Sequence, residues 1–174
     1  MERKNAWNTY DEKALEELGQ VTEQYRRFIS EGKTERECAR IAVEMARENG
    51  YISLEEAMGS GKNLVPGDKI YAVHKKKLVV LFQIGTVPME KGMNILGAHI
   101  DSPRLDLRPV PLFEKDGLAY FRTHYYGGIR KYQWPTIPLA LHGVVCREDG
   151  TTVTITIGEN DEDPVFTITD LLPH

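Results

Sequence analysis

The chain has 174 residues, enough for one ordinary domain or for two incomplete ones. Hydrophobic residues make up 41% and charged residues 28% of the chain, a composition typical of a soluble globular protein. Acidic residues outnumber basic ones by 26 to 22, and the resulting net charge of −4 argues against a general nucleic-acid binder, which would carry a basic excess.

Neither a membrane span nor a secretion signal is evident. The N-terminal residues are polar and lack the apolar centre of a signal peptide. The longest strongly apolar run, Leu78 to Phe82, is far too short to cross a bilayer. Cys38 and Cys146 are too far apart to form a Cys-x-x-Cys zinc site, and two cysteines do not make a disulfide framework. We therefore expect a reduced, cytoplasmic protein whose two cysteines are unpaired.

Two amphipathic helices are predicted at the start of the chain. Capping-box spacing places the first helix start near Thr9, and Gly32 ends it. Thr34 and Glu37 repeat this spacing at the start of the second helix, which ends at Asn49. Apolar residues recur at helical period and predict two core faces: Leu15, Leu18, Val21, Tyr25, Phe28 and Ile29, then Cys38, Ile41, Ala42, Met45 and Ala46.

A short turn and a loop follow the second helix. Ser53 is expected to cap a short helical turn. The stretch Gly59-Ser60-Gly61-Lys62 resembles a phosphate loop only superficially. It lacks the GxxxxGK[ST] spacing and a preceding strand, so we interpret it as a flexible loop.

From Lys69 onward the apolar pattern changes to the alternation of β-strands. A hairpin is predicted over residues 69–83, turning at Lys75-Lys76. Residues 94–99 are more continuously apolar and predict a strand buried on both faces. Further strands are predicted at residues 105–108, in hairpins over 112–125 and 139–157, and at 165–168, after which Asp170 is expected to cap another helix.

The change of pattern at Pro103 suggests a domain boundary. Residues 1–102 combine helices with strands, whereas residues 103–174 are almost entirely β in pattern. We therefore expect an α/β fold in which an α/β part is followed by a separate β-rich part.

His99 and Asp101 stand where the predicted buried strand ends. On an extended backbone residues i and i+2 point to the same side, so an imidazole and a carboxylate would emerge together. Histidine supplies a neutral ring nitrogen to a metal, and a nearby carboxylate commonly fixes its tautomer. The bare pattern is weak, because a histidine near a strand end is more often a hydrogen-bonded structural residue.

The longer string around these residues is more specific. Gly97-Ala98-His99-Ile100-Asp101-Ser102-Pro103-Arg104-Leu105 resembles the signature of the aspartyl aminopeptidase and vacuolar aminopeptidase I family of dinuclear zinc exopeptidases. Three further stretches resemble the same family and extend the likeness from near residue 3 to the end of the chain: Arg3-Lys4-Asn5-Ala6-Trp7, Tyr126-Gly127-Gly128 and Asp170-Leu171-Leu172-Pro173-His174.

The resemblance implies roles for His99 and Asp101 and a division of the chain into two domains. His99 matches a zinc ligand and Asp101 matches the residue that supports it, in a site that holds two Zn²⁺ ions when complete. The other ligands and the general base would lie outside this chain, so we expect these 174 residues alone to be inactive. Residues 1–102 would be the N-terminal part of a zinc-exopeptidase-like α/β catalytic domain, and residues 103–174 part of an inserted, mainly β dimerisation domain.

By resemblance, the parent protein would be a homo-oligomeric metalloaminopeptidase that releases N-terminal, possibly acidic, residues from peptides. The stretch Ile129-Arg130-Lys131-Tyr132-Gln133-Trp134 departs from the family's pattern, which has a histidine here that is linked to acidic specificity. The residues themselves leave two alternatives open: a non-enzymatic assembly module, or another amidohydrolase on the same core. His124 and His142 lie on predicted strands and are interpreted as structural.

Overall fold

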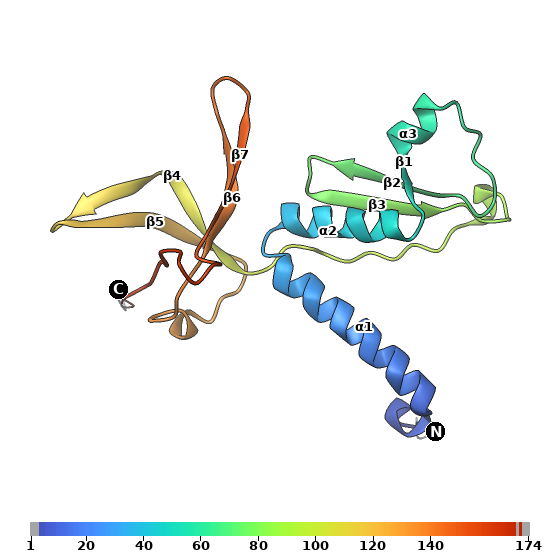
Figure 1. Cartoon of the computed structure of the whole chain (residues 1–174), viewed down its shortest axis with the longest axis horizontal. Helices are drawn as coiled ribbons and strands as arrows, with labels where there is room; N and C mark the ends of the chain where they lie inside the picture. Colours follow the sequence, from blue (N-terminus) through green and yellow to red (C-terminus); the bar gives the residue numbers. More distant parts are fainter. Residues whose placement is uncertain (1–3, 170, 172–174) are drawn as a thin grey trace. The chain divides into compact units, whose positions relative to one another are not determined.

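The computed structural model describes residues 4–169 and residue 171. The chain divides into two compact units, Met1–Ile100 and Asp101–His174. Figure 1 shows that the first unit contains the α-helices and a small sheet, and that the second consists mainly of β-hairpins. Asp170, predicted to cap a further helix, lies outside the described residues.

The first unit combines three α-helices and two 3₁₀ helices with a three-stranded sheet. The sheet has the order β1-β2-β3, with β1 parallel and β3 antiparallel to β2. Its elements are the 3₁₀ helix η1 (Ala6–Thr9), α1 (Glu12–Glu31), α2 (Glu35–Glu48), β1 (Ile52–Ser53), α3 (Leu54–Gly59), β2 (Lys69–His74), β3 (Leu78–Gln83) and η2 (Met89–Lys91).

The core of this unit lies between α2 and the sheet. The helix packs against β2 and β3, as Figure 1 shows. Burying a side chain such as Ile41 or Ile70 stabilises a fold by about 1.5–3 kcal/mol, and Arg47 Nε adds a hydrogen bond to the Tyr71 hydroxyl at 2.7 Å. The buried apolar residues are Cys38, Ala39, Ile41 and Ala46 of α2, Ala57 of α3, and Ile70 and Tyr71 of β2.

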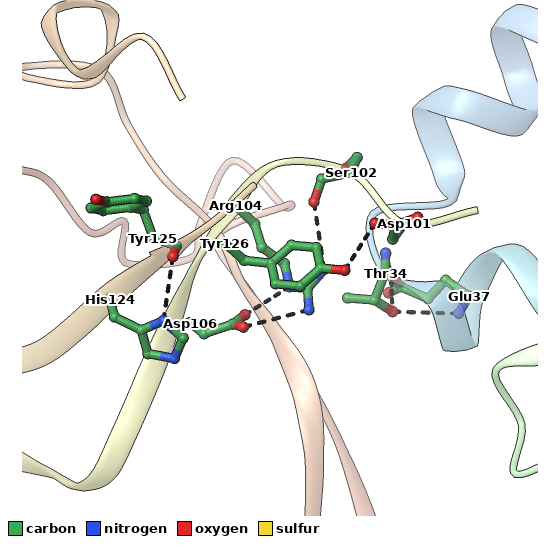
Figure 2. A network of polar contacts seen from close by, with 9 residues as sticks. All are labelled: Thr34, Glu37, Asp101, Ser102, Arg104, Asp106, His124, Tyr125 and Tyr126. Carbon is green, nitrogen blue, oxygen red and sulfur yellow. Dashed lines mark hydrogen bonds and ion pairs between the residues drawn. The ribbon is translucent and has the colours of Figure 1, made fainter. Parts of the chain in front are cut away.

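Two capping boxes predicted or suggested by the sequence are present. Thr34 Oγ1 accepts a hydrogen bond from the Glu37 backbone N–H, and Glu37 Oε2 accepts one from the Thr34 N–H at 2.8 Å (Figure 2). Ser53 and Glu56 form the same reciprocal pair at the start of α3. Both helices therefore begin where local side-chain chemistry satisfies their exposed N–H groups.

The start predicted for the first helix is wrong. Asp11, not Thr9, caps α1 by accepting a hydrogen bond from the Ala14 N–H at 2.8 Å. Thr9 closes η1 instead, where its hydroxyl donates to the Ala6 carbonyl at 2.7 Å. The end at Gly32 is confirmed, and a Cβ there would lie only 2.6 Å from Cys38 Sγ, so glycine permits the close approach of the two helices.

The apolar face of α1 is not a core face in the described structure. None of the residues of α1 is buried, and the Val21 and Tyr25 side chains are 61% and 62% exposed. Helical periodicity reports which residues share a face but not whether another element covers that face. The predicted core face is confirmed for α2, whose Cys38, Ile41 and Ala46 side chains are buried and which packs against the sheet.

The predicted hairpin over residues 69–83 is confirmed as β2–β3. Its turn residues Lys75 and Lys76 both have positive φ angles, of 49° and 59°, as a type I′ turn requires. His74 at the end of β2 is exposed, as the sequence indicated. Across residues 4–169 and 171, no helix is both long and apolar enough to cross a membrane.

The second unit contains two antiparallel hairpins. Asp116 and Gly117 turn the first with φ angles of 55° and 77°, at the turn that the sequence predicted. The predicted strand at 165–168 is reduced to isolated bridges of Phe166 with Leu139 and of Ile168 with Pro135. The elements of this unit are β4 (Arg104–Lys115), β5 (Leu118–Tyr126), η3 (Lys131–Gln133), β6 (Leu141–Cys146) and β7 (Thr152–Ile157).

A large irregularity interrupts the β4–β5 hairpin. The register shifts between Leu107, which pairs with Thr123, and Leu112, which pairs with Phe121. The intervening stretch Arg108–Pro111 includes Pro109 and Pro111, which cannot donate to the ladder. Prolines therefore account for the break between the two strand segments that the sequence predicted.

None of the described residues of the second unit is buried. Contacts such as that between the Phe121 and Phe166 rings, with centroids 5.6 Å apart, join parts of the unit without closing a core. Two-stranded hairpins are marginally stable by themselves in water. The buried apolar side chains that the structure describes thus all lie in the first unit.

The capping box of α2 gives a prediction for stability. We expect Thr34→Ala to lower the free energy of unfolding by about 1 kcal/mol, because the N-terminal N–H groups of α2 lose their acceptor. The matched control is Thr22→Ala, since Thr22 lies within α1 and donates to the Leu18 carbonyl. Urea unfolding followed by circular dichroism measures both, and equal losses in the two variants would contradict this role of Thr34.

The second capping box gives a prediction for pH. Hydrogen bonds from Ser53, with a smaller contribution from Arg47, lower the pKa of Glu56. A lowered folded-state pKa stabilises the fold above the unfolded value of about 4.3, and this stabilisation is lost as the pH falls through the folded-state pKa. Glu56→Gln should therefore flatten the acid limb of the stability–pH curve more than the neighbouring Glu55→Gln does, because the hydrogen bonds of the capping box are made by Glu56.

Candidate functional site

His99 lies on an exposed segment rather than at the end of a buried strand. Residues 92–103 contain no helix or strand, and the side chains of Ile95 and Leu96 are 79% and 99% exposed. The buried strand predicted at residues 94–99 is therefore wrong for the described structure. A strand needs a neighbour for its backbone groups, and within the described sheet β3 is an edge strand that this segment does not join. His99 is the penultimate residue of the first unit.

Asp101, by contrast, is half-buried and held by a tyrosine. The Tyr126 hydroxyl donates a hydrogen bond to Asp101 Oδ2 at 2.9 Å (Figure 2). Tyr126 is the last residue of β5, and both residues belong to the second unit. The bond connects two stretches on which the family resemblance depends, the His-x-Asp motif and the Tyr-Gly-Gly run.

Arg104 lies over the ring of Tyr126. Arg104 and Tyr126 face each other across the β4–β5 ladder, and the guanidinium carbon lies 4.2 Å from the centre of the tyrosine ring. Arg104 Nε also donates to Asp106 Oδ1 at 2.7 Å, and Nη1 reaches the Ser102 carbonyl at 3.5 Å. A stacked and ion-paired arginine thus limits the movement of the tyrosine ring.

The backbone turns sharply directly after Tyr126. Gly127 has a φ of 71°, and a Cβ added there would lie 3.5 Å from the Pro103 Cα. A residue with a side chain would be strained in this left-handed conformation. Gly127 therefore lets β5 end beside the Ser102-Pro103 stretch, which keeps Asp101 within reach of Tyr126.

The sequence identified Asp101 but missed Tyr126 as its partner. The Tyr-Gly-Gly run served only as a supporting stretch in the resemblance. The hairpin turn predicted at Asp116-Gly117 indicates that Tyr126 lies near the start of the facing strand, and so near Asp101. With an uninterrupted register, however, Tyr126 would face Leu107 instead of Arg104, so the signal alone gives the wrong neighbour.

The histidines interpreted as structural do make local contacts. His142 Nε2 lies 2.8 Å from Glu159 Oε1. His124 Nδ1 lies 3.3 Å from the Tyr125 carbonyl. Cys38 and Cys146 are both free thiols, as expected, and burial raises the pKa of the Cys38 thiol.

An imidazole and a carboxylate are suitable donors for zinc, yet they do not make a complete centre. Within the described residues no group of three or more His, Cys, Asp or Glu side chains is placed to hold a metal ion. A catalytic zinc normally has three protein ligands and an open position. The donor types of His99 and Asp101 are thus compatible with zinc, whereas the described part of the chain does not contain a whole site.

Comparison with known proteins identifies the family. The sequence profile of the family described as "Aminopeptidase I zinc metalloprotease (M18)" matches residues 28–174. The chain belongs to this M18 family. A curated relative, "Probable M18 family aminopeptidase 1" of Clostridium acetobutylicum, is 50% identical over 99% of this chain, and its namesake in Thermotoga maritima is 44% identical over the whole chain.

Solved M18 structures share the fold. The crystal structure of aminopeptidase I from Borrelia burgdorferi matches 98% of this chain and 41% of its own chain, with a TM-score of 0.87 and 44% identity. That of the M18 aminopeptidase from Thermotoga maritima matches 100% and 37% of the two chains, with a TM-score of 0.85 and 43% identity. The mixed α/β class is thereby confirmed. The chain spans 37% of the length of each of these two curated relatives.

The exposed segment around His99 gives a prediction for proteolysis. Thermolysin cuts before large apolar residues, so we expect its first cuts in the 174-residue chain at Ile95 and Leu96, which have no strand partner. Leu81 and Phe82 are the internal control, because their side chains are also exposed but their backbone is paired within β3. Mass spectrometry of the early fragments locates the cuts, and a first cut within β3 would contradict the prediction.

Proposed function

We propose that this chain supplies the N-terminal portion of a zinc metalloaminopeptidase, with His99 as a metal ligand and Asp101 as the residue that supports it. Membership of the M18 family supports the activity. The observation that supports the residues is the hydrogen bond from Tyr126 to Asp101, because it gives the carboxylate of the motif a defined partner. A carboxylate fixed on one oxygen is suited to orient an imidazole.

The proposed reaction is hydrolysis of the N-terminal peptide bond of a peptide. When bound, zinc would supply an activated water for this hydrolysis near neutral pH. The task of His99 is to present a neutral ring nitrogen to the metal. Asp101 would accept the N–H of the other ring nitrogen in a complete site and so keep the imidazole in the metal-binding tautomer.

The finer features of the proposal follow the resemblance. A complete centre holds two Zn²⁺ ions, with the remaining ligands and the general base supplied from outside these 174 residues. A preference for acidic N-terminal residues does not follow from the stretch 129–134, which lacks the family's histidine. A cytoplasmic location is supported by the two free cysteines.

The domain assignment is also a proposal. Residues 1–102 would belong to the catalytic domain and residues 103–174 to an inserted dimerisation domain. The division of the chain between Ile100 and Asp101 and the β-rich second unit are compatible with it. Homo-oligomer formation through the second unit is supported by its lack of buried residues among those described, since hairpins with open edges favour pairing with other chains.

The proposal predicts opposite behaviour for the short chain and for the full-length protein. The full-length protein should bind zinc and release N-terminal residues from peptides, and His99→Ala should abolish this activity by removing a ligand. The 174-residue chain should bind zinc weakly and hydrolyse no peptide, because one imidazole leaves most of the coordination sphere to water.

An aminopeptidase assay with added Zn²⁺ on both forms provides the test. The control is His142→Ala, which removes a histidine that is paired with Glu159 on the β6–β7 hairpin; it should retain activity in the full-length protein. Turnover by the purified short chain, lost on His99→Ala, would show that a complete site exists within these residues.

A further inference from the structure

We propose that Tyr126 is a positioning residue for Asp101, and that Arg104 holds the ring of Tyr126 in place. The inference rests on the proposed function, because it assigns Asp101 the task of supporting His99. It extends that function to a tyrosine that lies 25 residues further along the chain and makes no contact with the metal itself in this scheme.

The hydrogen bond has the geometry of an orienting contact. The distance of 2.9 Å between the Tyr126 hydroxyl and Asp101 Oδ2 is within the normal range for O–H···O bonds. A carboxylate has two oxygens with about four acceptor positions. The Asp101 carboxylate can therefore accept the tyrosine O–H on Oδ2 and still accept an imidazole N–H. The bond from Tyr126 restricts rotation of the carboxylate, and an imidazole N–H needs a carboxylate whose orientation is fixed.

The tyrosine ring is itself constrained. The Arg104 guanidinium lies 4.2 Å from the ring centre and is paired with Asp106, whose Oδ1 is 2.7 Å from Arg104 Nε. The Arg104 side chain is only 24% exposed, so this pair is partly shielded from water. An arginine that both stacks on a ring and pairs with a carboxylate favours one orientation of that ring.

The residue is poorly explained as a core residue. Tyr126 is 37% exposed, and none of the described residues of its unit is buried. Removing only the hydroxyl should therefore leave the hairpin folded while deleting the bond to Asp101. Tyr125 provides a matched control, because successive strand residues point to opposite faces and its ring lies beside Lys131.

The experiment measures zinc affinity of the full-length protein that carries this chain, by competition between the metal-free protein and a chromophoric chelator. We expect Asp101→Ala to weaken zinc binding by about 10–100-fold. Tyr126→Phe should weaken it by a smaller factor, up to about tenfold, because the tyrosine acts through the carboxylate. Tyr125→Phe should equal the wild type.

The double variant Asp101→Ala/Tyr126→Phe distinguishes positioning from a general structural role. If Tyr126 acts through Asp101, its substitution has no further effect once the carboxylate is absent, so the two losses are not additive. Additive losses, or a Tyr126→Phe protein that binds zinc as tightly as Tyr125→Phe, would overturn the proposal. The melting temperature of each metal-free variant reports whether it folds.

A second substitution covers the case in which Tyr126→Phe does not fold. Arg104→Gln keeps the tyrosine hydroxyl but removes the charge over the ring. Like Tyr126→Phe, it should weaken zinc binding when Asp101 is present and have no further effect when Asp101 is replaced by alanine. Unchanged zinc affinity of Arg104→Gln would contradict the proposal. The proposed function fails separately. If His99→Ala leaves zinc affinity unchanged, His99 is not a ligand, whereas an effect of His99→Ala without one of Tyr126→Phe overturns only the inference about Tyr126.

Discussion

The hydrogen bond between Tyr126 and Asp101 is the contact that connects the His-x-Asp motif to the β4–β5 hairpin. It joins the end of β5 to the residues that follow His99. Three further features surround it: Arg104 stacks on the tyrosine ring, Gly127 turns the chain with positive φ, and β4 pairs with β5 in the observed register. Cross-strand pairing, turn chemistry and an ion pair thus meet around a single polar contact.

The two units differ in what stabilises them. The first unit has a small core in which α2 lies on a three-stranded sheet, with capping boxes at the starts of α2 and α3. In the second unit, the described stabilisation comes from backbone ladders, ring contacts and ion pairs at partly exposed positions. Exposed ion pairs and isolated hairpins contribute little by themselves. The carboxylate of the motif therefore belongs to the unit in which no described residue is buried.

Features set by neighbouring residues could be predicted from the sequence. Thr34 with Glu37 and Ser53 with Glu56 satisfy helix ends within four residues, and Asp116-Gly117 provides the positive φ angles that a tight hairpin needs. Features that depend on distant partners could not. The run at residues 94–99 has the composition of a buried strand, but its exposure depends on whether another strand lies beside it. The prediction that the apolar face of α1 is a core face was wrong for the same reason, because it depends on whether another element covers that face.

The His-x-Asp motif was recognised from a continuous string, whereas Tyr126 was identified only as part of a supporting motif. Its contact with Asp101 follows from the irregular stretch Arg108–Pro111, because this stretch shifts the register of everything beyond it in the hairpin. Alternation of apolar residues does not reveal how many residues an irregularity absorbs.

The irregularity in β4 has a consequence for how this protein tolerates change over evolution. Surface-exposed stretches usually accept insertions and deletions freely, and Val110 within this one is 81% exposed. Here a gain or loss of one residue would rotate Arg104 to the opposite face of the hairpin from Tyr126. We therefore expect selection to act on the number of residues in this stretch as well as on the two prolines that interrupt the ladder.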